Sequence, residues 1–306
     1  MAPALLGLPL DDASRWTNTL NARLFANQSA KSALEMAAQD LAAQALGLPL
    51  HQALGGKQAA SQTHTLRTDY TISLGSASSM AAAAAEIVAK GFSEVKVKLG
   101  GHPEEDLKRL AAIRSITGPE LPLRLDANQG WNFSGALRVL TALADDGHIL
   151  FCEAPLPRWQ FTELPRLRKS VPIKIMADES CLDAHDAERL LAAGACDYLN
   201  VKIGKAGGLG PARAILKVAE TYGVEVQIGG FLESRLGFTA AAHLALCSPT
   251  VAFVDFDTPL MFEEDHVLGG LNYGSGGYLS LAPGLGLGAQ VAAEILEKQT
   301  HCSFMS

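Results

Sequence analysis

The 306-residue sequence has no uninterrupted apolar stretch of the roughly 18 residues that a membrane-spanning helix needs. Its start, MAPALLGLPLDDASRW, has no basic residue ahead of the apolar patch, and Asp11 and Asp12 follow at once, which is unlike a secretory signal. These two absences predict a cytoplasmic protein that does not contact a membrane.

Positive charge is also in short supply. The 25 Lys and Arg residues are outnumbered by 32 Asp and Glu, which gives a net charge of −7, and they form no cluster or stripe. Nucleic-acid-binding surfaces need such a stripe to follow the phosphate backbone. We therefore expect no nucleic acid partner.

Cysteine is sparse and unpaired in its spacing. The five cysteines include no CxxC pair, and four of them lie in segments that are predicted to be strand or helix. This pattern favours buried free thiols over a zinc or redox site. The residues are Cys152, Cys181, Cys196 and Cys247, with Cys302 in the tail.

The most regular feature is an alternation of short β-branched or apolar runs with Ala- and Leu-rich helical segments from about residue 65 onward. No GxGxxG motif follows the first run, which disfavours a dinucleotide-binding sheet. Eight runs with seven intervening helices predict an α/β fold, a (β/α)7β TIM-like barrel. The runs are TISL, EVKVKL, LPLRLDAN, ILFCEAP, IKIMADE, YLNVKIG, EVQIGG and FVDFDT.

Segments on either side of the barrel lack this alternation. Two helical patterns, at 14–24 and 30–46, precede it, and Gly47 and Pro49 act as stop signals for the second. The end of the chain is glycine-rich and finishes in a predicted helix at 289–298. The expected domains are a partial helical capping domain at 1–60, the barrel at 61–259, and a C-terminal segment packing on the cap at 260–306.

Charged residues recur at or near the C-terminal ends of successive predicted strands. The first five are separated by 28, 27, 25 and 24 residues, which is one strand-helix unit each. In a barrel these strand ends meet at one mouth, so the charges face one another. The residues are Lys98, Asp126, Glu153, Asp178, Lys202 and Asp255.

Asp126, Glu153 and Asp178 provide three adjacent hard oxygen ligands, which suits Mg²⁺, with Mn²⁺ also open. No His or Cys joins them, which disfavours zinc. Lys98 and Lys202 flank the triplet from opposite sides, which predicts proton transfer on both faces of a substrate carbon. The competing interpretation is a set of ordinary salt bridges, Lys98 with Asp126 and Lys202 with Asp178.

Five motifs follow one another along the barrel: KVKLG at 96–100, LDANQGW at 125–131, CEAP at 152–155, ADES at 177–180 and NVKIGKAGG at 200–208. Together they resemble the enolase superfamily, muconate lactonizing enzyme subgroup. The resemblance implies that a proton α to a carboxylate is removed through a magnesium-stabilised enediolate. It assigns Asp126, Glu153 and Asp178 to the metal, and Lys98 and Lys202 to the acid and base.

The eighth predicted strand ends in VDFDTP, which would place Asp255 and Asp257 on one face of the strand. This resembles the Asp-x-Asp motif of dipeptide epimerases, which binds the free α-amino group of the substrate. The resemblance therefore implies an isomerase that inverts the C-terminal residue of an L,L-dipeptide, with Thr71, Lys96 and Gly230 also touching the substrate. A strand-end salt bridge is the alternative for the aspartate pair.

Other functions remain open at this point. An N-acylamino acid racemase, an o-succinylbenzoate synthase or another muconate cycloisomerase-like enzyme would act on substrates that lack a free amine. No stretch matches the strands with which the family's capping domain opens, so a truncated and inactive barrel is a further alternative. A homo-oligomer is expected, and no role is assigned to Glu233 or Arg235 in the loop after the seventh strand.

Overall fold

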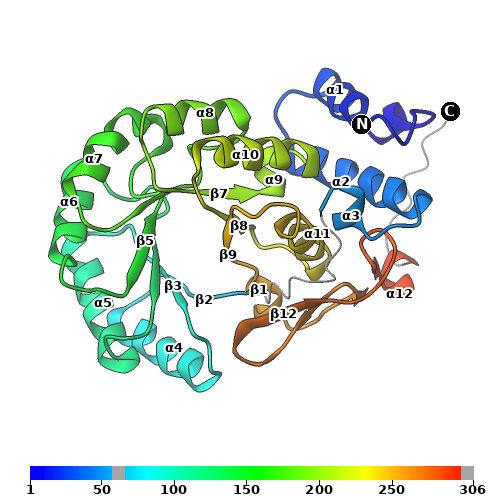
Figure 1. The fold of residues 1–306 in the computed structure, drawn as a ribbon. Helices are drawn as coiled ribbons and strands as arrows, with labels where there is room; N and C mark the ends of the chain where they lie inside the picture. Colours follow the sequence, from blue (N-terminus) through cyan, green and yellow to red (C-terminus); the bar gives the residue numbers. More distant parts are fainter. Residues whose placement is uncertain (57–65, 298–306) are drawn as a thin grey trace.

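The computed structural model describes residues 1–56 and 66–297, and its centre is a barrel of eight parallel strands arranged in sequence order (Figure 1). A parallel bridge between Thr68 and Val254 joins the two edges of the sheet and closes it. The predicted barrel is therefore confirmed. Its strands are β2 (Tyr70–Ile72), β3 (Val95–Lys98), β4 (Leu123–Asp126), β5 (Ile149–Glu153), β6 (Ile175–Ala177), β7 (Tyr198–Lys202), β8 (Val226–Gly229) and β9 (Val251–Val254).

Strand residues alternate between two environments, as the period of two requires. In β3, Val95 and Val97 are fully buried and belong to the apolar core, whereas Lys96 reaches acidic side chains of other strands. In β4, Arg124 likewise reaches an acidic side chain across the barrel, because its Nη1 donates to Asp69 Oδ2. The inside of this barrel therefore carries charged side chains, and most of its apolar core lies between the sheet and the helices.

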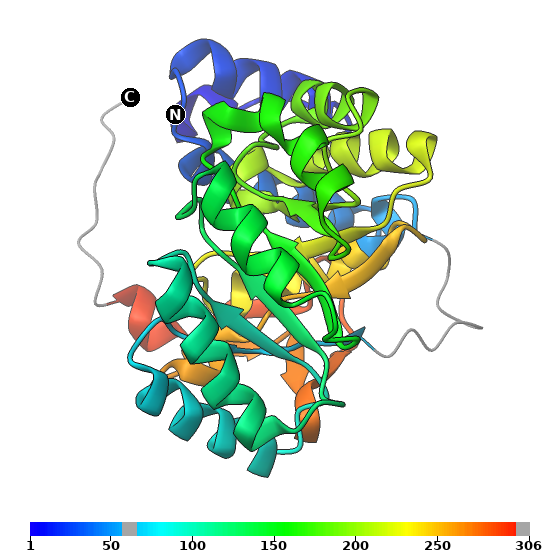
Figure 2. The ribbon, with the colours of Figure 1, turned by 90° about the vertical axis from the view of Figure 1, so that its left-hand side faces the viewer.

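Helices cover the outside of the sheet, running from cyan to green in Figure 2 and completed by the yellow helices in Figure 1. Several begin where a side chain accepts a backbone N–H of the first turn: Ser76 accepts from Ser79, and Asp183 from Asp186. The helices are α4 (Ala77–Ala89), α5 (Pro103–Thr117), α6 (Phe133–Ala142), α7 (Leu164–Ser170), α8 (Ala184–Ala192), α9 (Ile203–Ala206), α10 (Leu209–Tyr222) and α11 (Arg235–Ala245).

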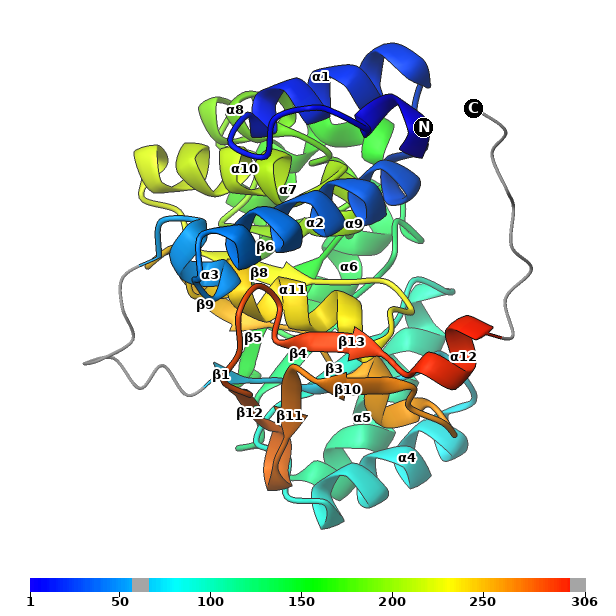
Figure 3. The ribbon, with the colours of Figure 1, turned by 90° about the vertical axis from the view of Figure 1, so that its right-hand side faces the viewer.

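The N-terminal part is helical, as predicted. A 3₁₀ turn (Ala2–Leu5) precedes α1 (Ala13–Arg23), α2 (Gln28–Ala45) and the short α3 (Leu50–Ala53). Gly47, at a φ of +68°, and Pro49 end the second helix where the stop signals predicted. Figure 3 shows α2 lying across one side of the barrel, where it contacts α9 and α10.

The C-terminal segment, together with β1, forms two small antiparallel sheets, and it contains the main error of the sequence prediction. The predicted helix at 289–298 is wrong over its first turn, because residues 289–291 pair with β10 as a strand. The strands are β1 (Leu66–Arg67), β10 (Val267–Gly269), β11 (Leu271–Tyr273), β12 (Tyr278–Leu281) and β13 (Ala289–Val291), followed by α12 (Ala293–Glu297); Lys298 lies outside the described residues.

Two expectations about composition can be compared with the described part of the chain. None of its helices is long and apolar enough to cross a membrane. Cys152, Cys181 and Cys196 are buried free thiols, as predicted, and Cys247 is a half-buried one. Cys302 lies outside the described residues.

Candidate active site

A cavity of about 770 Å³ opens at the C-terminal ends of the barrel strands. Eight of the ten residues predicted from the sequence line it, and the other two, Asp126 and Glu153, are fully buried. Residues as far apart in the chain as Thr71 and Asp257 therefore share one site. The eight are Thr71, Lys96, Lys98, Asp178, Lys202, Gly230, Asp255 and Asp257.

Three carboxylates follow one another around this mouth on adjacent strands. Asp126 and Glu153 end β4 and β5 and are register partners, and Asp178 directly follows β6. The first two accept hydrogen bonds from neighbours: Asn128 N–H donates to Asp126 Oδ1 (2.9 Å), and Asn200 Nδ2 donates to Glu153 Oε1 (2.7 Å). The side chains are thus fixed in place by the fold.

Lysine ammonium groups stand among these carboxylates. Lys96 Nζ lies 3.1 Å from Asp126 Oδ2 and 3.0 Å from Glu153 Oε2, so it bridges the first two members. Although burial works in the opposite direction, the carboxylates around Lys96 hold its pKa well above its ordinary value. The ammonium therefore separates two acids that would otherwise repel each other.

The electrostatics of the triplet set Glu153 apart from the two aspartates. Burial, together with the charge of Asp126, raises the pKa of Glu153 to about 7. The pKa values of Asp126 and Asp178 are lowered, because lysines outweigh the opposing effect of burial. Three hard oxygen donors, one of them only partly ionised at neutral pH, fit the needs of a divalent cation such as Mg²⁺.

The two lysines predicted to move protons lie at opposite ends of the triplet. Lys98 Nζ donates to Asp126 Oδ2 at 2.7 Å, and Lys202 Nζ donates to Asp178 Oδ2 at 2.8 Å. These are the pairs named in the salt-bridge interpretation, and both residues also line the cavity. A substrate held between them would present one face to each.

Lys205 is a site residue that the sequence prediction missed, although it lies inside the NVKIGKAGG motif. Its ammonium donates to Asp178 Oδ1 (2.6 Å), the Asp178 carbonyl (2.6 Å) and the Asn200 carbonyl (2.9 Å), and it is buried. A lysine three residues after Lys202, in an otherwise apolar and glycine-rich turn, was the available signal.

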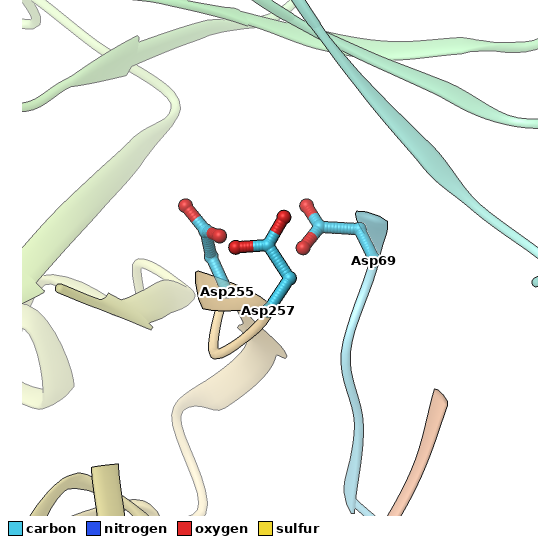
Figure 4. Close-up of side chains that lie close together, drawn as sticks. All are labelled: Asp69, Asp255 and Asp257. Carbon is cyan, nitrogen blue, oxygen red and sulfur yellow. The ribbon is translucent and has the colours of Figure 1, made fainter. Parts of the chain in front are cut away.

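The aspartate pair is arranged differently from the prediction. Strand β9 ends at Val254, and Asp257 lies in a turn with φ −82° and ψ −20°, so the two residues do not share a strand face. Their carboxylates nevertheless point toward each other and toward Asp69 (Figure 4). Oxygen atoms of Asp69, Asp255 and Asp257 all lie within 4.8 Å of one another, the one such acidic group among the described residues.

This group already has counter-charges from two sides. Lys96 Nζ lies 2.7 Å from Asp255 Oδ2, and Arg124 Nη1 lies 3.0 Å from Asp69 Oδ2. The Thr71 N–H donates to Asp257 Oδ2 at 2.6 Å. Asp255 and Asp257 line the cavity, and we call this pair the anionic wall. Asp69 is fully buried behind the pair and does not line the cavity.

The two aspartates of this wall differ in charge. Despite burial, Lys96 lowers the pKa of Asp255 to about 2. Burial and the neighbouring Asp255 charge raise the pKa of Asp257 to about 7, against the opposing hydrogen bond from Thr71. Asp255 is therefore anionic at neutral pH, whereas Asp257 titrates there.

The loop after β8 contributes backbone and shape. A Cβ at Gly230 would lie 2.5 Å from the Phe238 ring, so this position has room only for glycine. Glu233 Oε1 accepts the Phe231 N–H at 3.2 Å. Arg235 contacts Asp265 and the Leu271 carbonyl, and so it fastens the C-terminal segment.

Comparisons with known proteins agree with this geometry. Residues 1–55 match the mandelate racemase / muconate lactonizing enzyme N-terminal domain, and residues 79–295 match the enolase C-terminal domain-like family. A D-Ala-D/L-Ala epimerase from Cytophaga hutchinsonii is 45% identical over 94% of this chain and 77% of the relative. An L-Ala-D/L-Glu epimerase from Bacillus subtilis is 39% identical over 94% of this chain and 78% of that protein.

Solved structures give the same result. The crystal structure of a dipeptide epimerase from Cytophaga hutchinsonii, complexed with Mg and the dipeptide D-Ala-L-Val, superposes with a TM-score of 0.93. It is 44% identical and covers 96% of this chain and 78% of its own. The chain therefore belongs to the mandelate racemase and muconate lactonizing enzyme family of the enolase superfamily, and within that family it is dipeptide epimerase-like.

Proposed function

We propose that this chain is a metal-dependent dipeptide epimerase, which inverts the α-carbon of the C-terminal residue by proton transfer between Lys98 and Lys202. One observation carries the proposal. The two lysines stand at opposite ends of a carboxylate triplet, and the Asp255–Asp257 pair faces the same cavity. The site thus offers an acid and a base together with a counter-charge for a substrate ammonium.

The aspartate pair distinguishes the proposed substrate class from the alternatives. A free α-ammonium group would be attracted to Asp255 and Asp257, with charge-assisted hydrogen bonds to their oxygens. N-acylamino acids and the dicarboxylate substrates of cycloisomerases offer no ammonium, and their carboxylates would be repelled there. Among the functions considered, the pair therefore favours a dipeptide substrate.

Asp126, Glu153 and Asp178 would hold the metal. Magnesium bound there supplies positive charge that offsets the charge developing on the substrate carboxylate when the α-carbon loses its proton. Mn²⁺ has the same preference for oxygen ligands and would also fit.

The protein's own contribution to the reaction is the placement of the two amines. Asp178 raises the pKa of Lys202 despite burial, so this residue is a stable ammonium when no substrate is present, the state required of the acid. Lys98 is the more exposed partner, with 28% of its side chain accessible, and it faces the cavity from β3. One lysine gives a proton to one face while the other receives the proton from the opposite face.

The test is mass-spectrometric detection of deuterium incorporated in D₂O, using a panel of L,L-dipeptides and N-acylamino acids with Mg²⁺ or with a chelator. We expect metal-dependent exchange at the C-terminal α-carbon of free-amine dipeptides. Exchange confined to N-acylated substrates would support the racemase alternative instead. Folded protein that exchanges no substrate would contradict the proposal and favour an inactive barrel.

Binding of the ammonium group should depend on pH through Asp257. Its pKa of about 7 means that the carboxylate loses its charge as the pH falls, whereas a bound ammonium favours the charged form. KM for a free-amine dipeptide should therefore rise roughly tenfold per pH unit below pH 7, while kcat changes much less. Steady-state kinetics between pH 5.5 and 8.5 would measure this.

The matched control for this pH profile is Asp257→Asn, which cannot titrate at that position. We expect a high KM for this variant, with the step near pH 7 removed. An unchanged step in the Asn variant would show that another group governs ammonium binding.

A further inference from the structure

The turn that follows Lys202 is tied to the active site on one side. Lys202 is the N-cap residue of α9, a four-residue helix that carries Lys205 and leads into Gly207 and Gly208. Lys205 fastens this turn to Asp178 and to the Asn200 carbonyl. The position of the Lys202 backbone therefore depends on how this short segment is held.

The other side of the same turn is held by α2 of the N-terminal helices, where Ser29 Oγ donates to the Gly204 carbonyl at 3.4 Å and Glu35 makes two contacts. Glu35 of α2 is fully buried, and its carboxylate accepts the Leu209 N–H at 2.6 Å and the Gly210 N–H at 3.0 Å. These N–H groups belong to the first turn of α10 and have no partner within that helix. The helix dipole also favours a negative charge at this end.

The backbone is shaped to admit this contact. Gly208 has a φ of +142°, and a Cβ there would lie 2.6 Å from Glu35 Oε2. Gly207, at φ +95°, would bring a Cβ within 3.3 Å of the Gln28 side chain. Because both positions favour glycine, α2 can approach the α9–α10 turn closely, and Figure 3 shows the two segments side by side.

The contact is also directional. The side chains that α2 buries include Lys31, Ser32 and Glu35, so polar groups make up much of its buried face. Apolar surfaces tolerate sliding, whereas a carboxylate with two short backbone hydrogen bonds fixes a position closely. Burying that carboxylate costs free energy unless its hydrogen-bond donors are in place. The position of α2 and the conformation of the α9–α10 turn therefore stabilise one another.

The segment that follows Lys98, the other proton-transfer lysine, is held by different hydrogen bonds. After Lys98, the Gly100 N–H donates to Asp106 Oδ2 of α5 at 3.2 Å, and Trp131 Nε1 donates to the same oxygen at 2.8 Å. These contacts lie within the barrel and do not involve α2. The two proton-transfer residues therefore depend on two separate supports.

We infer that Glu35 is a positioning residue for Lys202, through which the N-terminal helices control proton transfer on one face of the substrate only. This inference rests on the proposed epimerase function. Displacement of a catalytic group by about 1 Å can reduce the rate about 100-fold, so a loosened turn should act on Lys202 while leaving Lys98 in place.

The experiment compares Glu35→Ala with Asp40→Ala, starting separately from each epimer of one dipeptide in D₂O. Asp40 lies in the same helix and accepts the Leu287 N–H at 2.7 Å, so its loss loosens α2 at a point away from the turn. For Glu35→Ala we expect epimerisation to fall about 10- to 100-fold in both directions. Deuterium uptake without inversion should persist from the epimer that Lys98 deprotonates, and uptake from the other epimer should fall by the same factor as epimerisation.

Glu35→Gln keeps one oxygen acceptor and should give an intermediate rate with the same asymmetry, and it serves as the test variant if the alanine variant does not fold. Equal loss of exchange from both epimers, or a Glu35 variant that behaves like Asp40→Ala, would overturn the inference. Wild-type protein that exchanges neither epimer would contradict the proposed function itself, a result that is seen before any variant is made.

Discussion

Replacement of Lys202 by alanine is expected to reduce epimerisation about 10³- to 10⁴-fold in both directions, because one face of the substrate then has no acid or base. Exchange with solvent deuterium should continue from one epimer, since Lys98 can still remove and return a proton on its own face. Chiral chromatography and mass spectrometry of the same samples measure inversion and exchange separately.

The mirror variant is Lys98→Ala, for which exchange should persist from the other epimer. Neither replacement leaves a buried carboxylate without a positively charged partner, because Asp178 keeps its bond to Lys205 and Asp126 keeps its pair with Lys96. Folding should therefore survive, and thermal unfolding checks this directly. If both variants kept exchange from the same epimer, the assignment of one lysine to each face would be wrong.

Magnesium should stabilise the protein by a large amount if the carboxylate triplet holds it. A ligand at 100 times its Kd adds about 2.7 kcal/mol to the free energy of unfolding, which corresponds to a rise in Tm of about 5 °C. Glu153→Gln removes one ligand and should abolish both this rise and the epimerase activity. Differential scanning calorimetry with Mg²⁺ and with a chelator provides the measurement.

The effect of magnesium on Tm should also depend on pH. The pKa of Glu153 in the folded protein is raised from 4.5 to about 7, so its protonation favours folding. That contribution is complete below about pH 4.5 and is lost as the pH rises through 7. Because magnesium takes the place of the proton, its effect on Tm should be larger at pH 8 than at pH 6.

Asp69→Asn is the matched control for Glu153→Gln. It replaces a carboxyl group that is also fully buried inside the barrel but belongs to the group with Asp255 and Asp257. We expect the magnesium-dependent rise in Tm to survive in this variant. A rise that is lost in Asp69→Asn and kept in Glu153→Gln would move the metal to the aspartate group.

The sequence predicted the barrel and most of its mouth because both follow from local periodicity. One charge per strand-helix unit is visible in the spacing from Lys98 to Lys202, and parallel strands bring such residues together whatever the loops do. For the same reason, eight of the ten predicted residues line one cavity.

What the sequence could not predict depends on contacts between distant segments. Residues 289–291 became a strand because β10 was available to pair with them, which overrode their helical pattern. Asp257 left the strand because the chain turns after Val254, yet it faces Asp255 all the same. In the sequence, Glu35 looks like an ordinary polar residue of a helix. Its role depends on a contact with Leu209, which lies 174 positions later in the chain.

The edge where the first and last barrel strands meet is expected to form late in folding. Thr68 and Val254 are joined across it, and the Thr71 N–H reaches Asp257 over 186 residues of chain. Contacts between such distant residues carry the largest loop-closure entropy, so we expect this edge to close after the local strand-helix units have formed. The anionic wall of Asp255 and Asp257 is therefore completed only at closure. If it binds the substrate ammonium as proposed, the bound substrate should slow reopening of the barrel at this edge.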